Sequence, residues 1–146
     1  TKVLFWDFDG SLARRAPDWR LAEGALDTLE TLSAKGWRHV VIDDTEGLET
    51  LCAELGLAAH LETIVGGVVK SDPAYLKRAL ERVAPYEEAF VIGDGVATDI
   101  AAARAALLPS ILVGDASPLA QFCVETLAEI PLALETWATM RRALLS

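Results

Sequence analysis

Four short apolar runs alternate along the chain with longer segments in which apolar residues recur every three or four positions. The runs are Val3–Trp6, Val40–Ile42, Phe90–Ile92 and Ile111–Val113. They lack an apolar–polar alternation, which is typical of strands buried on both faces. The segments with helical spacing are Leu21–Ala34, Gly47–Leu55, Pro73–Val83 and Ala97–Leu107. Leu61–Val65 and Phe122–Val124 predict two further strands, and Leu132–Leu145 predicts a closing helix.

This alternation of strands and helices predicts the fold class. Strands that alternate with helices form a parallel sheet with right-handed crossovers and helices on both faces. We therefore expect a single doubly wound, Rossmann-like α/β domain over residues 1–146, with a central parallel sheet flanked by helices. The sequence contains no repeat, linker or shift of composition that would indicate a second domain.

Composition and charge narrow the choice of partners. Apolar residues make up 52% of the 146 residues, which is a globular composition, and the net charge is −9. Such an acidic chain without a basic block is not expected to bind nucleic acid or an anionic membrane as its main partner. No run approaches the ~18 apolar residues of a membrane span, so we expect a soluble cytoplasmic protein. Cys52 and Cys123 fit no metal-binding spacing and are predicted to fill core positions.

Aspartates follow three of the predicted strands. They are Asp7 and Asp9, then Asp43 and Asp44, and finally Asp94 with Asp99 five residues on. Because the carboxyl ends of parallel strands meet at one edge of the sheet, these six carboxylates should converge there. Clustered carboxylates repel one another unless a cation lies among them, and oxygen ligands of this kind suit Mg²⁺.

Each segment also has a plain structural interpretation. The stretch F5-W-D-F-D-G-S-L12 could be a strand end with an Asp-Gly turn, and V91-I-G-D-G-V-A-T-D99 could be an ordinary strand–turn–helix junction. Lys70, a cation placed near this acidic edge, could be a solvated surface residue. The convergence of three strand ends favours a functional site over these separate explanations.

In this order the motifs resemble the haloacid dehalogenase (HAD) superfamily, in its phosphatase branch. The resemblance covers nearly the whole chain and rests on D7-F-D-G-S-L12, Lys70 with Asp72-Pro73, and G93-D94-G-V-A-T-D99. It implies a Mg²⁺-dependent phosphohydrolase that cleaves a phosphomonoester through an aspartyl-phosphate intermediate.

The resemblance also implies a role for each residue. Asp7 would be the nucleophile and Asp9 the general acid and base. Asp94 would bind Mg²⁺ together with the Asp7 carboxylate and the backbone carbonyl of Asp9, while Asp99 would bind the ion or orient its waters. Lys70 would neutralise the nucleophile and the phosphoryl oxygens.

The residues expected to bind the phosphoryl group are Gly10, Asp43, Asp44 and Lys70. At Asp43 the sequence departs from the family. The family carries a Ser or Thr hydroxyl at the end of the second strand, where this chain has Asp43. An ionised carboxylate only accepts hydrogen bonds and repels a phosphoryl group at close range. Thr45, two residues on, is an alternative donor. Asp43 could weaken phosphate binding, be protonated or turned away, or mark a binding or regulatory domain that has lost turnover.

The spacing leaves no room for the cap domain that many family members carry. Between Gly10 and Leu21 there is one loop, and between Asp44 and Lys70 there is one helix and one short strand. The site should therefore be open. An open site suits a phosphorylated macromolecule as well as a small molecule, and a homo-oligomer could cover it.

Overall fold

The computed structural model describes residues 1–145 and contains a six-stranded parallel sheet with the strand order β5-β4-β1-β6-β7-β8. The strands are β1 (Lys2–Trp6), β4 (Trp37–Ile42), β5 (Thr63–Val65), β6 (Glu88–Gly93), β7 (Ser110–Val113) and β8 (Phe122–Val124). The chain passes from β1 outward through β4 to β5 and then returns to the other side of β1 with β6. The strand order thus reverses at β1 and β6, and in open parallel sheets ligands bind at the carboxyl ends of the strands at such a point.

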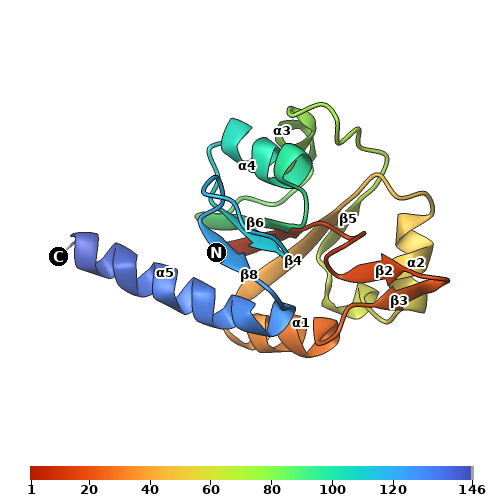
Figure 1. The fold of residues 1–146 in the computed structure, drawn as a ribbon, viewed down its shortest axis with the longest axis horizontal. Coiled ribbons are helices and arrows are strands. Elements are labelled where there is room, and N and C mark those ends of the chain that lie inside the picture. The colour runs from red at the N-terminus through yellow and green to blue at the C-terminus, as the bar shows by residue number, and fades with distance from the viewer. Residues whose placement is uncertain (146) are drawn as a thin grey trace.

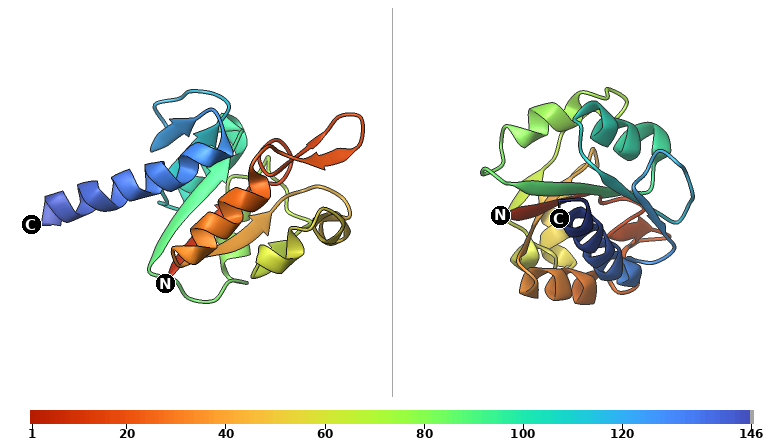
Figure 2. Two further views of the ribbon diagram at one scale, coloured as in Figure 1. Left: turned by 90° about the horizontal axis from the view of Figure 1, so that it is seen from below. Right: turned by 90° about the vertical axis from the view of Figure 1, so that its left-hand side faces the viewer.

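Helices cover both faces of the sheet (Figures 1 and 2). They are α1 (Ala25–Ala34), α2 (Leu48–Glu54), α3 (Tyr75–Leu80), α4 (Ala101–Ala105) and α5 (Ile130–Leu145), with short helical turns at Ala58–His60 and Leu127–Glu129. Figure 1 shows α3 and α4 on one face and α1 on the other, with the C-terminal half of α5 extending beyond the body of the molecule. The α/β class with a parallel, doubly wound sheet is confirmed.

Two apolar cores, one on each face, explain why the strand sequences are continuously apolar. In β1, Leu4 and Trp6 belong to the core beneath α1, whereas Val3 and Phe5 belong to the core beneath α3 and α4. Successive residues of a strand point to opposite faces, so a strand covered on both sides is apolar at most positions.

One prediction about the segment after β1 was wrong. Residues 13–21 form an antiparallel hairpin of β2 (Ala13–Arg15) and β3 (Trp19–Leu21), where we expected a loop and a helix from Leu21. The Trp19 ring packs on Phe8, with ring centroids 5.1 Å apart. This contact holds the hairpin against the segment that follows β1, and α1 begins at Ala25, after the hairpin.

Three smaller differences concern helix bounds and a cysteine. α3 is shorter than the predicted Pro73–Val83, and the segment before α4 is a π-helix over Val96–Ile100. Cys52 is buried as predicted, but Cys123, in the edge strand β8, is exposed, so its predicted core position is wrong. Within residues 1–145, neither the hairpin after β1 nor the segment between β4 and Lys70 contains an inserted cap domain. None of the described helices is long and apolar enough to cross a membrane.

Candidate active site

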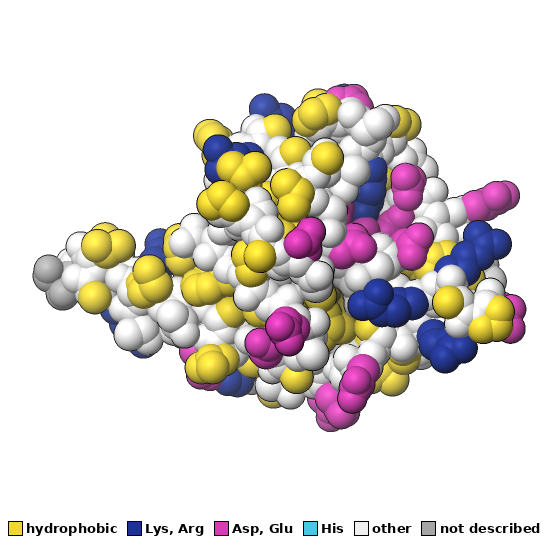
Figure 3. All heavy atoms as spheres, in the orientation of Figure 1, with side chains coloured by type: hydrophobic (Ala, Val, Ile, Leu, Met, Phe, Trp, Pro, Cys, Tyr) yellow, Lys and Arg dark blue, Asp and Glu magenta, His cyan; other side chains and the backbone are white. Residues whose placement is uncertain are grey.

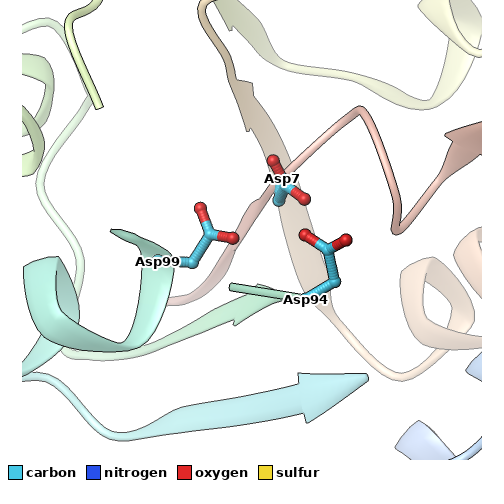
Figure 4. Close-up of side chains that lie close together, drawn as sticks. All are labelled: Asp7, Asp94 and Asp99. Atoms are coloured by element: carbon cyan, nitrogen blue, oxygen red, sulfur yellow. The ribbon is translucent and has the colours of Figure 1, made fainter. Parts of the chain in front are cut away.

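Three carboxylates from separate segments meet at the carboxyl ends of β1 and β6 (Figure 4). Asp7 directly follows β1, Asp94 directly follows β6, and Asp99 lies in the π-helix. Each offers one oxygen within 4.8 Å of the others. The predicted convergence of aspartates at this edge is therefore observed for these three residues.

Two glycines make this close approach possible. A Cβ atom at Gly10 would lie 1.9 Å from Asp94 Oδ2, and a Cβ atom at Gly93 would lie 2.4 Å from the Asp99 side chain. Gly10 also has a φ of +92°, a conformation that side chains with a Cβ rarely adopt. Gly10, after β1, thus leaves space for the Asp94 carboxylate, and Gly93, the last residue of β6, leaves space for Asp99.

The Asp7 carboxylate accepts a hydrogen bond at each oxygen. Lys70 Nζ donates to Oδ1, and Ser11 Oγ donates to Oδ2 at 3.1 Å. Lys70 Nζ also donates to Asp99 Oδ1 at 2.9 Å, which in turn accepts from Tyr75 Oη at 3.3 Å. Lys70 therefore bridges two of the three clustered carboxylates, from the segment between β5 and α3.

The charges at this cluster are unbalanced without a further cation. Burial above all, and then the neighbouring Asp99 carboxylate, raise the pKa of Asp7 to about 10 against the opposing charge of Lys70. The carboxylates around Lys70 raise its pKa despite its burial, so it stays charged. A divalent cation among Asp7, Asp94 and Asp99 would return Asp7 to its ionised form, and three carboxylate oxygens are the hard ligands that Mg²⁺ takes. The donor set fits such an ion.

Asp9 lies next to this cluster, with its side chain exposed to solvent. Slight burial, followed by the charges of Asp43 and Asp94, raises its pKa. Its side chain is not one of the three carboxylates that come within 4.8 Å of one another. An exposed carboxyl group of raised pKa beside Asp7 is able to exchange a proton with a bound group.

Asp43 is buried and turned toward the backbone that follows β1. Its Oδ2 accepts hydrogen bonds from the backbone amides of Phe8 at 2.8 Å and Asp9 at 2.9 Å, and lies 3.5 Å from Lys70 Nζ. Burial alone would raise the pKa of Asp43, but the hydrogen bond with Asp7, the Lys70 charge and the Asp9 amide hold it well below its usual range. The four hydrogen bonds that the Asp43 oxygens accept, from the Phe8, Asp9 and Thr45 amides and the Thr45 hydroxyl, favour its ionised form.

Thr45, the alternative donor to a phosphoryl group, bonds to Asp43. The Thr45 hydroxyl donates to Asp43 Oδ1 at 3.0 Å, as does the Thr45 amide at 3.1 Å. The side chain of Asp44 is exposed, and a hydrogen bond with Asp43 above all raises its pKa. Thr45 thus fixes Asp43 instead of replacing it.

The site opens to solvent beside the loop that follows β4. A hollow of about 590 Å³ is lined by residues 44–50 together with Gly66 and Gly67. In the view of Figure 3, acidic side chains gather near the middle of the molecule, and basic side chains lie beside them over the β2–β3 hairpin. The hollow begins at Asp44, the residue after Asp43.

Two residues that bond to this cluster were not singled out from the sequence. Ser11 belongs to the D7-F-D-G-S-L12 motif, and its place four residues after Asp7 is the signal that could have indicated the contact. Tyr75 gave no such signal, because a buried tyrosine in a helix is indistinguishable by pattern from a core residue.

The parallel sheet carries clustered carboxylates and a lysine at the point where its strand order reverses. This arrangement agrees with the class of hydrolases that the HAD motifs indicate. Residues 1–106 match the family model of the haloacid dehalogenase-like hydrolases, and the chain therefore belongs to this family. The comparison with curated proteins gave no match.

Solved structures share the fold over most of the chain. An uncharacterized protein from Listeria monocytogenes serotype 4b superposes with a TM-score of 0.78 at 20% identity, covering 95% of this chain and 99% of its own. A HAD phosphatase from Thermococcus onnurineus gives 0.77 at 15% identity, with 92% and 98% covered. The HAD-hydrolase YfnB from Bacillus subtilis, described as bound to magnesium, gives 0.67 at 19% identity, with 75% and 54% covered. At these identities the likeness establishes the fold.

Proposed function

We propose that the chain is a Mg²⁺-dependent phosphohydrolase that cleaves a phosphomonoester through an aspartyl phosphate on Asp7. The observation that carries this proposal is the contact of Lys70 with Asp7 at the point where Asp94 and Asp99 also converge. Phosphoryl transfer depends mainly on positioning and on neutralising charge, and this arrangement supplies both. The membership of the family and the phosphatase among the similar structures support it.

In the first half of the reaction an Asp7 carboxylate oxygen attacks the phosphorus atom. The bond from phosphorus to the ester oxygen breaks, and Asp9 donates its proton to this leaving oxygen. In the second half, Asp9 takes a proton from a water molecule, whose oxygen attacks the phosphorus. The bond between phosphorus and Asp7 then breaks, and inorganic phosphate leaves.

The remaining residues hold these groups in place. Lys70 and Ser11 fix the two oxygens of Asp7, so that the carboxylate keeps one orientation for attack. Mg²⁺, held by Asp7, Asp94, Asp99 and the backbone carbonyl of Asp9, would supply positive charge to the phosphoryl oxygens and keep Asp7 ionised.

The open site bears on the class of substrate. No inserted domain within residues 1–145 encloses the carboxylates, and a wide hollow lies along the loop that follows Asp43. A phosphorylated macromolecule or a small phosphomonoester could enter, and a second copy of the chain could cover the site.

The test is the hydrolysis of p-nitrophenyl phosphate with and without Mg²⁺. We expect activity only with the metal, and Asp7→Asn should abolish it because an amide oxygen is a poor nucleophile. Asp9→Asn should lower kcat by about 10²–10⁴-fold, the usual contribution of a general acid and base. An Asp7→Asn protein with the parent's rate would refute the nucleophile assignment.

The second candidate is a binding or regulatory domain that keeps the fold and the metal site without efficient turnover. Asp43 is the observation that favours it, because a carboxylate stands where the family has a hydroxyl. A parent protein that binds Mg²⁺ but hydrolyses none of a panel of phosphomonoesters would favour this candidate.

A further inference from the structure

The two backbone amides that follow Asp7 both point at one oxygen of another aspartate. The amides of Phe8 and Asp9 donate to Asp43 Oδ2 at 2.8 and 2.9 Å. Lys70 Nζ lies 3.5 Å from the same oxygen while it also bonds to Asp7. Three donors with positive charge or partial positive charge thus surround a single anionic oxygen beside the candidate nucleophile.

Such a group of donors is an oxyanion site. Consecutive backbone N–H groups form a concavity that binds anions, and preorganised donors of this kind stabilise charge on transferring groups. A phosphoryl oxygen and a carboxylate oxygen carry similar charge and accept the same hydrogen bonds. A phosphoryl group in contact with Asp7 would lie beside these donors, because the two amides belong to the residues that follow Asp7 and Lys70 bonds to Asp7 itself.

We infer that Asp43 is an internal anion that occupies the oxyanion site for the phosphoryl group, so that a substrate must displace it to bind. This inference rests on the proposed function and adds a control of phosphate affinity to the same site. The position of the side chain is fixed at both oxygens, since Thr45 holds Oδ1 through its amide and its hydroxyl. Thr45 is therefore the residue that keeps Asp43 in place.

The geometry also defines the opposing explanation. Asp43 could instead be a positioning residue that aligns the Phe8 and Asp9 amides and Lys70 for catalysis. In that case its removal would disorder the donors and weaken the binding of phosphate. In the case we infer, its removal would free the donors and strengthen the binding. The two explanations thus predict opposite signs.

The experiment is a calorimetric titration of the full chain with inorganic phosphate in the presence of Mg²⁺. Asp43→Ser should bind phosphate about 10–100-fold more tightly than the parent, because repulsion is removed and a hydroxyl donor is added. Thr45→Val, which keeps the shape of the side chain but removes the hydroxyl, should give a smaller gain. Glu46→Ser is the matched control, since it removes one exposed carboxylate from the same loop, and it should change the Kd by less than about twofold.

A second variant at position 43 controls for the possibility that Asp43→Ser does not fold. Asp43→Asn keeps the volume of the side chain and should shift phosphate affinity in the same direction as Asp43→Ser. For both variants the rise in Tm on adding phosphate should exceed that of the parent. Phosphate binding that is unchanged or weaker in both Asp43 variants would overturn the inference, as would an equal gain in Glu46→Ser.

The outcome separates this inference from the proposed function. If the Asp43 variants bind phosphate more tightly but neither they nor the parent hydrolyse p-nitrophenyl phosphate, the inference stands and the phosphohydrolase proposal fails. If the parent hydrolyses the ester and the Asp43 variants lose both activity and phosphate binding, the proposed function stands and the inference fails.

Discussion

The backbone of Gly10 lies directly against the carboxylate of Asp94, so close that a Cβ atom at Gly10 would come within 1.9 Å of Asp94 Oδ2. The two residues belong to strand ends 84 positions apart in sequence that pair side by side in the sheet. The position of one candidate metal ligand thus depends on the absence of a side chain on the neighbouring segment. This relationship yields a prediction that separates metal binding from general stability.

We expect Gly10→Ala to displace the Asp94 carboxylate and to lower hydrolysis at least about 100-fold, because misplaced catalytic groups lose rate steeply. Gly56→Ala is the matched control, since Gly56 also has a positive φ of 78° but a Cβ there would meet nothing within 4 Å. Both variants should lose about 1–2 kcal/mol of stability from backbone strain, and only Gly10→Ala should lose activity. Steady-state rates and urea unfolding of the two variants provide the measurement. Equal activity in both would show that the Asp94 position does not depend on Gly10.

Mg²⁺ should stabilise the folded chain, because it relieves repulsion among Asp7, Asp94 and Asp99 and binds only where they are assembled. At a concentration 100 times the Kd the gain is about 2.7 kcal/mol, which is a rise in Tm of roughly 5–10 °C for a chain of this size. The measurement is thermal unfolding with and without Mg²⁺.

The rise should vanish in Asp94→Ala and persist in Asp27→Ala, which removes an exposed carboxylate from α1. A parent whose Tm does not respond to Mg²⁺, or an Asp94→Ala protein that keeps the full response, would contradict a metal site at these residues.

The apolar runs predicted the sheet because a strand buried on both faces has a distinctive sequence. β1, β4, β6 and β7 were all located, each within three residues at either end. The β2–β3 hairpin was missed, since a three-residue strand such as Trp19–Leu21 has no period of its own and is held by the contact of Trp19 with Phe8. A short element that is held by tertiary contacts leaves no periodic pattern in the sequence.

In the candidate site, too, some features could be predicted from the sequence and others depend on tertiary contacts. The topology of a parallel sheet brings strand ends together, so the meeting of Asp7 with Asp94 could be predicted from their places after strands. The orientation of Asp43 could not, because it depends on hydrogen bonds to the amides of Phe8 and Asp9 that only the folded backbone supplies. The position of Asp43 after a strand predicted that it lies near the site, but only the folded structure shows which way its side chain points.

Outside the site, a buried histidine predicts that the stability of the fold depends on pH. The Nδ1 atom of His39 accepts a hydrogen bond from Trp6 Nε1 at 3.0 Å, and its Nε2 lies 3.1 Å from the carbonyl oxygen of Leu29. Since the indole N–H can only donate, Nδ1 must be unprotonated and the proton must lie on Nε2, which donates to Leu29. A second proton on Nδ1 would face the indole N–H. Burial lowers the pKa of His39 to about 4.

We therefore expect acid to destabilise the fold through His39. The unfolded chain takes up a proton near the ordinary histidine pKa of 6.5, whereas the folded chain resists protonation down to about 4. Stability from the neutral ring is thus fully present above pH 6.5 and is lost progressively as the pH falls toward 4. Between about pH 7.5 and about pH 5 this linkage amounts to about 2 kcal/mol in the free energy of unfolding. Urea unfolding at the two pH values measures it.

Two histidine variants show whether His39 is the group responsible. His39→Gln should remove this part of the pH dependence while keeping groups that can accept from Trp6 and donate to Leu29. His60→Gln should retain it, because His60 is only partly buried and lies at the end of a short helical turn. If the parent and His39→Gln lost the same stability on acidification, the carboxylates alone would account for the pH dependence and the assignment to His39 would be wrong.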